Sequence, residues 1–460
     1  MRAMNGQEIK QAVRGRLISV VNPNPITGLS IDSRTANRDD VFFAITGDKF
    51  DGHDYLESAA DKGCIAAVVD IARSYPQSLL ERFTAGVIAV PDTRQALLDF
   101  AAYYRKILPA TVVAVTGSNG KTTVKSMINH ILSKRLIGTS SPKSYNNEIG
   151  VPLTITSASA GDDYVICEVG TNAPGEIRTL ARAIKPNIGV ITNIGPVHLQ
   201  GLNSIEAIAA EKASLIGWLG DRDHAVVWAD SKELMRAIKA LGKKFITFGE
   251  SPEANLRLTN YKQIGWAQRF EINNRDWVEL PVPGKHNALN ALAAIAVAAR
   301  FGFTQADAAA ALADFTGVGM RLERIDAGPV CVINDAYNAN PSSVRAAASV
   351  VANHKSSRKV LILGDMFELG PESASYHSRL GSDLASLGFD LIVGVGELSK
   401  YTVEAAASNG CEIAHYENSQ NACNDVLNII KPGDLILTKG SRAMQMDTIA
   451  KVIIDHFKEQ

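Results

Sequence analysis

The sequence predicts an α/β protein of three domains: a small mixed α/β domain, a central domain with a parallel sheet, and a C-terminal doubly wound domain. Its 460 residues allow about three domains of ordinary size. Buried strands alternate with helices in two successive stretches, which is typical of parallel sheets covered on both faces. Pro109 marks the start of the first of these stretches, and the glycine-rich segment Gly317–Met320 separates it from the second. We therefore expect domains at residues 1–109, 110–318 and 319–460.

Short apolar runs bounded by Gly, Asp and Pro indicate the strands of the first domain. A helical pattern at Arg94–Lys106 follows them and ends before Pro109. A small mixed α/β domain is therefore expected ahead of this proline. Its apolar runs are Val41–Ile45, Ile65–Val69 and Val87–Val90.

The central stretch repeats a pattern of strand, turn and helix. The strand Thr111–Val115 leads through a glycine-rich turn into a helix at Thr122–Lys134, whose apolar residues fall on one face. An alanine-rich helix at Asn287–Arg300 is expected to close the domain. Further buried strands are expected at Tyr164–Val169, Ile188–Thr192 and Ala225–Trp228.

The alternation of strands and helices resumes after Gly317–Met320. This pattern predicts a second, smaller doubly wound domain of the Rossmann type. Its strands are expected at Val330–Ile333, Lys359–Leu363, Leu391–Val395 and Leu435–Thr438.

Composition and charge exclude several classes of protein. Hydrophobic residues make up 46% of the chain and charged residues 21%, the balance of a globular protein. With 47 Lys and Arg against 48 Asp and Glu, no net field draws the chain to nucleic acid or to a membrane surface. The most apolar segment, Ala288–Ala299, is shorter than the roughly 20 residues that span a bilayer. We expect neither nucleic-acid binding nor membrane insertion.

Cysteines and the N-terminus predict the compartment. The five cysteines are scattered and lack the paired spacing of a zinc site or a disulfide framework. The segment MRAMNGQEIK carries charge and no apolar stretch, unlike a signal peptide. We therefore expect a cytoplasmic protein with buried free thiols at Cys64, Cys167, Cys331, Cys411 and Cys423.

The strongest local motif is AVTGSNGKTT at residues 114–123, between a strand and a helix. Gly117 and Gly120 allow a tight turn with inward N–H groups, and the following helix dipole favours anions. Lys121 is expected to contact the outer phosphates of a nucleotide and Thr122 to contact Mg²⁺. The strict P-loop pattern is not met, because Val115 stands in place of its first glycine. The alternative is an ordinary strand-to-helix turn.

Two titratable residues follow at the edge where a parallel sheet presents ligands, and a third lies on a helix. Glu168 ends the next strand, and a carboxylate near phosphates requires a cation between them. His198 follows a further strand, although a lone histidine is more often structural. Lys212 lies on a predicted helix, where a solvated surface lysine is the default interpretation.

Taken together and in order, these motifs resemble the Mur ligases, which build the peptide stem of bacterial peptidoglycan precursors. The resemblance covers nearly the whole chain and rests on five segments: TGSNGKTT at 116–123, EVG at 168–170, NIGPVHL at 193–199, EKASL at 211–215 and GKHNALNALAA at 284–294. Membership implies ATP as substrate, Mg²⁺, most simply as two ions, and carbamylation of Lys212 to an anionic oxygen ligand.

The resemblance also implies roles for individual residues. The catalytic residues are expected to be Lys121, Lys212, His198 and Arg321, and the metal ligands Thr122, Glu168, His198 and Lys212. The first domain is expected to hold a UDP-linked substrate, whose contacts include Ser33, Arg34, Asn146 and Asn147. Nucleotide contacts are expected from Gly117, Ser118, Asn119, Gly120, Lys121, Thr122, Thr123, His286, Asn287, Asn290, Arg321, Asp335, Tyr337 and Asn338.

Four further segments resemble the family members that join D-alanyl-D-alanine to UDP-N-acetylmuramoyl-tripeptide: NNEIGVPLT at 146–154, DAYNANPSS at 335–343, GDMFELG at 364–370 and KGSR at 439–442. The DNPR motif of the enzyme that adds the third stem residue does not occur. The resemblance implies reaction through an acyl phosphate, and we expect a monomer. Alternatives are a ligase of the same superfamily with another acceptor, a kinase, or a nucleotide-sugar sensor. In isolation DAYNANP is also an Asx-rich turn, and Lys439 and Arg442 are equally compatible with surface charges.

Overall fold

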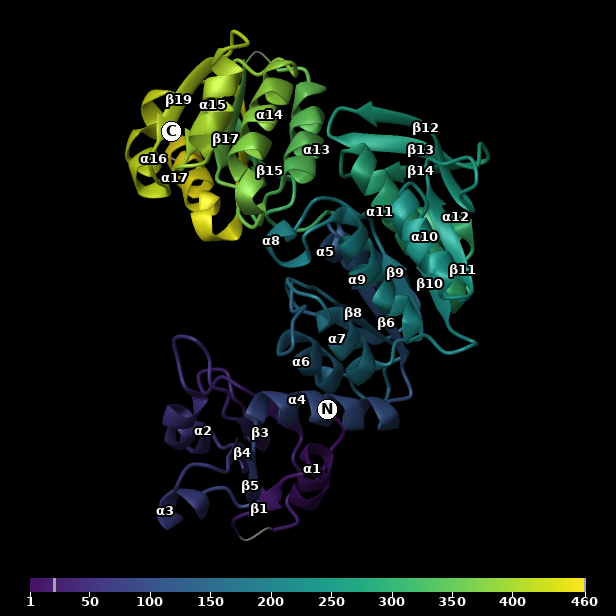
Figure 1. The fold of residues 1–460 in the computed structure, drawn as a ribbon, viewed down its shortest axis with the longest axis vertical. Helices are drawn as coiled ribbons and strands as arrows, with labels where there is room; N and C mark the ends of the chain where they lie inside the picture. Colours follow the sequence, from purple (N-terminus) through teal and green to yellow (C-terminus); the bar gives the residue numbers. More distant parts are fainter. Residues whose placement is uncertain (20–21, 357, 459–460) are drawn as a thin grey trace.

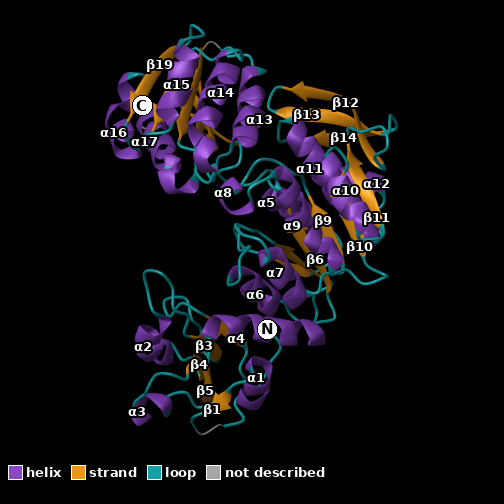
Figure 2. Ribbon diagram, in the orientation of Figure 1, coloured by secondary structure: helices purple, strands orange, loops and turns teal. Residues whose placement is uncertain are grey.

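The computed structural model describes residues 1–19, 22–356 and 358–458. They form three sheets that follow one another along the chain, each covered by helices (Figures 1 and 2). The α/β class predicted from the sequence is therefore confirmed. Within the described ranges, no helix is long and apolar enough to cross a bilayer.

The first domain combines helices with a sheet, as predicted, and the sheet has the order β1-β5-β4-β3-β2. Only β1 runs antiparallel to its neighbour, and the other pairs are parallel. Its strands are β1 (Arg16–Leu17), β2 (Gly28–Ser30), β3 (Asp40–Phe43), β4 (Ala66–Asp70) and β5 (Gly86–Val90). Its helices are α1 (Gly6–Val13), α2 (Leu56–Asp61), α3 (Gln77–Leu80) and α4 (Thr93–Ile107).

Helix α4 joins the first domain to the central one. It begins at Asp92, whose carboxylate accepts the backbone N–H groups of Arg94 and Gln95 and so satisfies two free donors of the first turn. Its other side packs on α6 (Gly150–Ser157) and α7 (Glu176–Ile184) of the central domain. As a result, one continuous hydrophobic cluster spans both domains.

The central sheet has nine strands in the order β14-β13-β12-β11-β10-β9-β6-β8-β7. Strands β6 to β12 form the predicted parallel core, but β13 and β14 run antiparallel. The expectation of a purely parallel sheet is wrong at this edge, because these strands alternate buried and exposed residues, as strands with one wet face do. The strands are β6 (Thr111–Thr116), β7 (Gly138–Ser140), β8 (Tyr164–Glu168), β9 (Ile188–Ile191), β10 (His224–Trp228), β11 (Phe245–Gly249), β12 (Leu256–Ile264), β13 (Ala267–Ile272) and β14 (Asp276–Leu280).

The helices of the central domain include the three that were predicted, namely α5, α9 and α11. The alanine-rich helix α11 does not close the domain as expected, because α12 follows it and packs on β14. Besides α6 and α7, the helices are α5 (Lys121–Leu132), α8 (Leu199–Leu202), α9 (Ile205–Gly217), α10 (Lys232–Ala240), α11 (Lys285–Ala298) and α12 (Gln305–Leu312).

The last sheet has the order β15-β16-β20-β17-β18-β19 and helices on both faces (Figure 2). Its four predicted strands are present, and two edge strands, β15 and β19, extend it. Strand β15 is antiparallel to its neighbour. The strands are β15 (Glu323–Ala327), β16 (Val330–Asp335), β17 (Arg358–Gly364), β18 (Leu391–Val395), β19 (Glu412–Tyr416) and β20 (Asp434–Lys439). The helices are α13 (Pro341–Ala352), α14 (Ser373–Ala385), α15 (Ser399–Ala407), α16 (Ser419–Asp425) and α17 (Met446–Lys458).

All five cysteines are free thiols, as expected, but burial was predicted correctly for only two of them. Cys64 and Cys167 are buried, whereas Cys331, Cys411 and Cys423 are partly exposed. The last two lie in outer elements, since Cys411 precedes the edge strand β19 and Cys423 lies on α16.

Candidate active site

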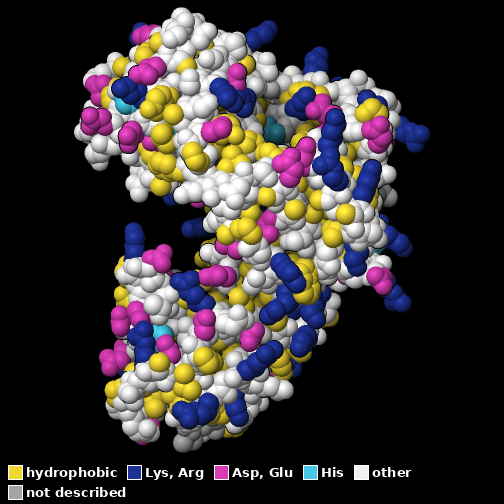
Figure 3. Space-filling model, in the orientation of Figure 1, with side chains coloured by type: hydrophobic (Ala, Val, Ile, Leu, Met, Phe, Trp, Pro, Cys, Tyr) yellow, Lys and Arg dark blue, Asp and Glu magenta, His cyan; other side chains and the backbone are white. Residues whose placement is uncertain are grey.

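A cleft of about 1170 Å³ lies between the central and last domains. Its volume exceeds the roughly 300–1,000 Å³ of a pocket for one small ligand, which leaves room for more than one substrate. On the face drawn in Figure 3, the molecule is also hollowed between the first and last domains. The cleft is lined by 17 of the predicted residues: Ser118, Asn119, Gly120, Lys121, Thr122, Thr123, Asn146, Asn147, Glu168, His198, His286, Asn287, Asn290, Arg321, Asp335, Tyr337 and Asn338.

The loop between β6 and α5 forms one end of this cleft. Gly117 and Gly120 have φ of +150° and +79°, a region that other residues rarely adopt. A Cβ atom at Gly120 would lie 2.5 Å from Oδ1 of Asn290. The tight turn directs the N-terminus of α5 into the cleft, where its free N–H groups and dipole favour an anion. This geometry fits the predicted phosphate loop.

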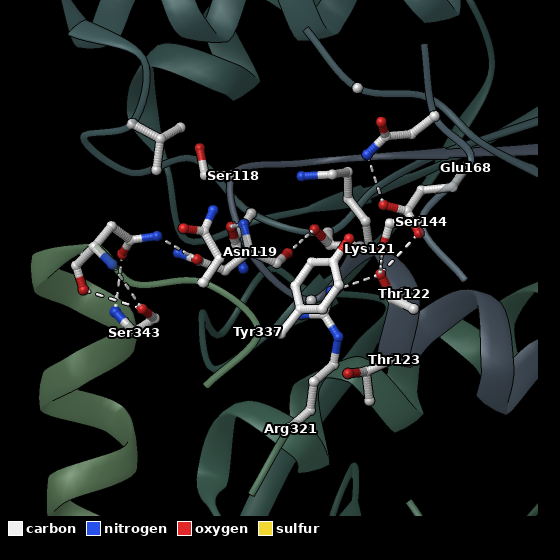
Figure 4. Close-up of a pocket in the computed structure, with 18 of the residues that line it drawn as sticks. Ser118, Asn119, Lys121, Thr122, Thr123, Ser144, Glu168, Arg321, Tyr337 and Ser343 are labelled. Carbon is white, nitrogen blue, oxygen red and sulfur yellow. Dashed lines mark hydrogen bonds between the residues drawn. The ribbon is translucent and has the colours of Figure 1, made fainter. Parts of the chain in front are cut away.

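Lys121 and Thr122 follow the loop and begin α5 (Figure 4). The ammonium of Lys121 donates to the carbonyl of Gly117 at 2.9 Å, and burial lowers the pKa of Lys121. The hydroxyl of Thr122 donates to Glu168 Oε2 at 2.8 Å and lies 3.1 Å from the hydroxyl of Ser144. A cation, a hydroxyl and a carboxylate therefore meet at the same end of the cleft.

Glu168, the last residue of β8, is the centre of a buried polar cluster. Its Oε1 accepts from the amide of Asn146 at 3.0 Å, and its Oε2 lies 4.0 Å from the ammonium of Lys125. Lys125 also donates to the carbonyl of Ser141 at 2.6 Å, and burial lowers its pKa. The sequence analysis missed Lys125, although its position four residues after Lys121 places both on one helix face.

Arg321 reaches across from the last domain to the phosphate loop. Its guanidinium donates to the hydroxyl of Thr122 at 2.8 Å and stacks over the ring of Tyr337, 4.3 Å from the ring centre. Figure 4 shows this side chain extending toward the loop from the last domain's side of the cleft. Two cations from different domains, Lys121 and Arg321, thus lie where the phosphates of a nucleotide were predicted.

A second contact between the domains involves Asn119 at the tip of the loop. Its carboxamide donates to the hydroxyl of Ser342 at 3.1 Å and accepts from the amide of Asn340 at 2.6 Å. Asn340 is the N-cap of α13, and Pro341 follows it at the first helical position, where proline is favoured. The N-terminus of α13 therefore also faces the phosphate loop.

The four predicted metal ligands are only partly brought together. Thr122 and Glu168 are in contact, whereas Nδ1 of His198 lies 2.5 Å from Glu368 of the last domain, and Lys212 does not line the cleft. Within the described ranges, no three His, Cys, Asp or Glu side chains cluster as a metal site. The metal roles of the four residues stay a prediction.

Lys212 on α9 is not the solvated lysine that its local sequence suggested. Its side chain is 1% exposed. Its pKa lies well below the ordinary value, because the group is buried and faces the ammonium of Lys121. Burial next to another cation disfavours the charged form of an amine, and buried lysines of this kind serve as bases and nucleophiles in proteins.

The segment that begins α11 forms the opposite wall of the phosphate loop. Asn287 donates to the carbonyl of Pro283 at 2.8 Å and accepts from Asn290 at 3.1 Å. Burial lowers the pKa of His286 to about 4, so its imidazole is neutral at physiological pH. These residues offer hydrogen-bonding groups without charge, which suits a nucleobase rather than a phosphate.

The last domain contributes a buried ion pair to the cleft. Asp335 and Lys439 are 2.5 Å apart, and the side chain of Lys439 is 3% exposed, so its interpretation as a surface charge is wrong. Arg442 is by contrast 54% exposed and pairs with Asp447 at 3.1 Å. The DAYNANP segment is therefore fixed to the sheet by a charge pair rather than being a free turn.

The predicted substrate residues fall into two groups. Asn146 and Asn147 line the cleft, and Asn147 accepts the backbone N–H groups at the start of α6. Ser33 and Arg34 lie in the first domain and do not line the cleft. Ser33 is buried, and the exposed Arg34 pairs with Asp32 at 2.6 Å.

Three family models match the chain in succession. They are the Mur ligase family catalytic domain at residues 25–105, the Mur ligase middle domain at 115–298, and the Mur ligase glutamate ligase domain at 320–442. The matched segments carry the phosphate loop, the α11 segment and the DAYNANP segment described above.

Full-length relatives agree with these models. The UDP-N-acetylmuramoyl-tripeptide–D-alanyl-D-alanine ligase of Bacillus subtilis is 34% identical over 98% of both chains. The enzyme of that name from Escherichia coli is 31% identical over 93% of this chain and 94% of its own. A crystal structure of MurF from Acinetobacter baumannii superposes with a TM-score of 0.89 at 30% identity, covering 99% of both chains. The chain belongs to the Mur ligase family.

Proposed function

We propose that this chain uses ATP to join D-alanyl-D-alanine to the terminal carboxylate of UDP-N-acetylmuramoyl-tripeptide, releasing ADP and phosphate. The observation that carries the proposal is the contact of Arg321, from the last domain, with the phosphate loop that holds Lys121. The names of the full-length relatives supply the reaction. A kinase would transfer phosphate without joining two substrates, and a sensor would bind without turnover, so the omission assay below separates them from a ligase.

The reaction needs an activated carboxylate, because an amine cannot displace oxide from an ionised acid. The terminal carboxylate oxygen attacks the γ-phosphorus of ATP, ADP leaves, and an acyl phosphate forms. The amine of the dipeptide then attacks the acyl carbon, and phosphate leaves from the tetrahedral intermediate. Repulsion between anions dominates the first step, so Lys121 and Arg321 are proposed to lower the barrier by neutralising charge. The water-sensitive intermediate also explains a site enclosed by several domains.

The oxygen groups beside the loop fit Mg²⁺. This ion keeps several waters and is held by one or two carboxylates together with substrate phosphates, so a cluster of protein carboxylates is not required. Thr122 and Glu168, already 2.8 Å apart, would supply the protein oxygens. The Nδ1 of His198 is held by Glu368, which leaves its Nε2 for the metal. When bound, the ion neutralises phosphate charge.

Lys212 fits the predicted carbamate. Carbamylation requires the uncharged form of an amine, and burial beside Lys121 favours that form by lowering the pKa of Lys212. The product would place anionic oxygens next to Lys121, which faces this position. Lys212→Ala is expected to lose most activity and to regain part of it with short carboxylates, whereas Lys232→Ala on the exposed face of α10 is expected to change nothing. Full activity of Lys212→Ala would remove the carbamate from the mechanism.

Other groups of the cleft are proposed to bind the rest of the substrates. His286, Asn287 and Asn290 would contact the adenine, and Asp335, Tyr337 and Asn338 would face the nucleotide from the last domain. Ser33 and Arg34 would hold the UDP moiety, for which Arg34 must exchange Asp32 for the pyrophosphate. Asn146 and Asn147 would contact the stem peptide. Both ATP and nucleotide-linked precursors are cytoplasmic, and the free thiols fit that reducing compartment.

An omission assay tests the proposed reaction. Phosphate release is measured with ATP and Mg²⁺ while UDP-N-acetylmuramoyl-tripeptide, D-alanyl-D-alanine or other candidate amines are left out in turn. Turnover is expected only with both substrates, and mass spectrometry is expected to find the dipeptide added to the tripeptide. A product with another amine would assign a different ligase of the family, and turnover by Lys121→Ala at the normal rate would refute the site.

A further inference from the structure

Arg442 is the one cationic side chain of the cleft that the reaction described above leaves unused. Among the described residues that line the cleft, the Lys and Arg side chains are Lys121, Arg321, Lys439 and Arg442. The first two contact the phosphate loop and the third is paired with a buried carboxylate. Arg442 is 54% exposed, and its carboxylate partner, Asp447, is also partly in water. Such exposed pairs are weak and easily exchanged.

The surroundings of Arg442 place it between the hinge and the loop that follows β17. Its Nη1 lies 3.9 Å from the sulfur of Met320, the residue before Arg321. The hydroxyl of the preceding residue, Ser441, accepts the backbone N–H of Phe367 at 2.9 Å. Arg442 and Phe367 therefore stand on two loops that are bonded to each other at the carboxyl ends of neighbouring strands.

This corner has the chemistry of a site for a small dipeptide with a free carboxylate. The guanidinium offers paired N–H donors that match a carboxylate. The ring of Phe367 is 41% exposed and, with Ala443, supplies apolar surface for methyl groups. Arg442 lines the same cleft as Lys121 and Arg321, so a dipeptide bound by its carboxylate at Arg442 would have its amine in that cleft.

We propose that Arg442 binds the terminal carboxylate of the acceptor dipeptide, with Phe367 packing on its side chains, and thereby sets both the acceptor class and the direction of the attacking amine. This assignment rests on the proposed function. It makes Arg442 a specificity residue of the second half-reaction, because the acyl phosphate forms before the dipeptide is used.

The test pairs one substitution with one change in the ligand. Steady-state kinetics are measured for the wild type and Arg442→Gln with D-alanyl-D-alanine and with its C-terminal amide. Loss of a charge-assisted hydrogen bond is expected to raise the KM for the dipeptide about 10- to 100-fold, with the KM values for ATP and UDP-tripeptide unchanged. The wild type is expected to prefer the acid over the amide by a similar factor, and Arg442→Gln is expected to treat the two alike.

Two controls separate this role from others. Arg324→Gln removes another exposed arginine of the same domain, 40% exposed and paired with Asp326, and is expected to keep all wild-type constants. Hydroxylamine trapping of the acyl phosphate without dipeptide is expected to be as fast in Arg442→Gln as in the wild type.

Three results would overturn the assignment. A raised KM for ATP with slower trapping would place Arg442 on the phosphates, and a raised KM for the UDP-tripeptide would place it on a carboxylate of the stem. A preference for the acid that persists in Arg442→Gln would show that another group binds the carboxylate. If instead the wild type neither traps an acyl phosphate nor turns over, the proposed function fails, and the assignment fails with it.

Discussion

A buried ion pair at the carboxyl ends of β16 and β20 tests how the last domain holds its part of the site. Nζ of Lys439 lies 2.5 Å from Oδ2 of Asp335 and donates to the carbonyl of Asn338 at 2.9 Å. The other carboxylate oxygen accepts the backbone N–H of Leu322 at 3.1 Å. The pair therefore connects the two strands, the DAYNANP segment and the chain leaving the hinge.

Replacing Lys439 by Met removes the charge and fills much of the space with a flexible apolar side chain. Asp335 then stays buried without its counter-ion, which costs about 3–5 kcal/mol, whereas breaking an exposed pair costs about 0–1 kcal/mol. The remaining hydrogen bond from Leu322 offsets only about 1 kcal/mol of that cost. We expect the free energy of unfolding of the last domain to fall by about 3 kcal/mol.

Amide hydrogen exchange provides the assay, because a chain of several domains need not unfold in one step. In Lys439→Met, the slow amides of β16 and β20 are expected to exchange about 100-fold faster, while those of β8 stay unchanged. Arg345→Met, which breaks the exposed pair with Asp383, serves as the control. Wild-type exchange in Lys439→Met, or no recovery when Asp335→Asn is added, would refute the reasoning.

Three further predictions concern motion, acid and thiols. Rotation about Gly317–Met320 is expected to make the chain more compact when an ATP analogue and both other substrates are bound, and superimposable scattering profiles would contradict it. Burial lowers the pKa of His286 to about 4 from about 6.5, so on acidification the unfolded chain binds this proton first and the free energy of unfolding falls between these two pH values. When unfolding is measured at several pH values, His286→Gln is expected to show a shallower loss of stability than the wild type, and an equal slope would exclude the effect. Burial raises the pKa of the Cys64 and Cys167 thiols to about 12. Alkylation of these two thiols at neutral pH is therefore expected to be slower than alkylation of the partly exposed Cys423. Equal alkylation rates, measured by peptide mass spectrometry, would contradict this prediction.

The phosphate loop is the part of the site most readable from sequence, because its determinants are local. Gly117 and Gly120 supply the positive φ that the turn requires, and Lys121 and Thr122 open the helix that follows. The neighbouring strands are continuous apolar runs in the sequence, which is typical of parallel strands buried on both faces. The antiparallel edge of the central sheet was missed, although the alternation of β13 and β14 carries a signal of period two.

Contacts between domains could not be predicted from local sequence patterns. Arg321 and Thr122 are separated by 199 positions, and Asn119 and Asn340 by 221. Single polar residues in loops have no period, so nothing local indicates which of them will meet. The burial of Lys212 likewise depends on how α9 packs, and only the family resemblance singled this residue out.

The way the three domains are joined suggests which of them moves. The first and central domains share one hydrophobic cluster through α4. Separating the two domains would expose this apolar surface at a free-energy cost of about 25 cal/mol per Å². The last domain has its own clusters, to which, within the described ranges, the central domain adds one partly buried side chain, Trp266. Its contacts near the phosphate end include hydrogen bonds of Asn119 and Thr122 and the pair of His198 with the exposed Glu368, each worth about 1 kcal/mol. Binding of a triphosphate there can exchange these bonds at little cost, so nucleotide binding and rotation of the last domain are expected to be coupled.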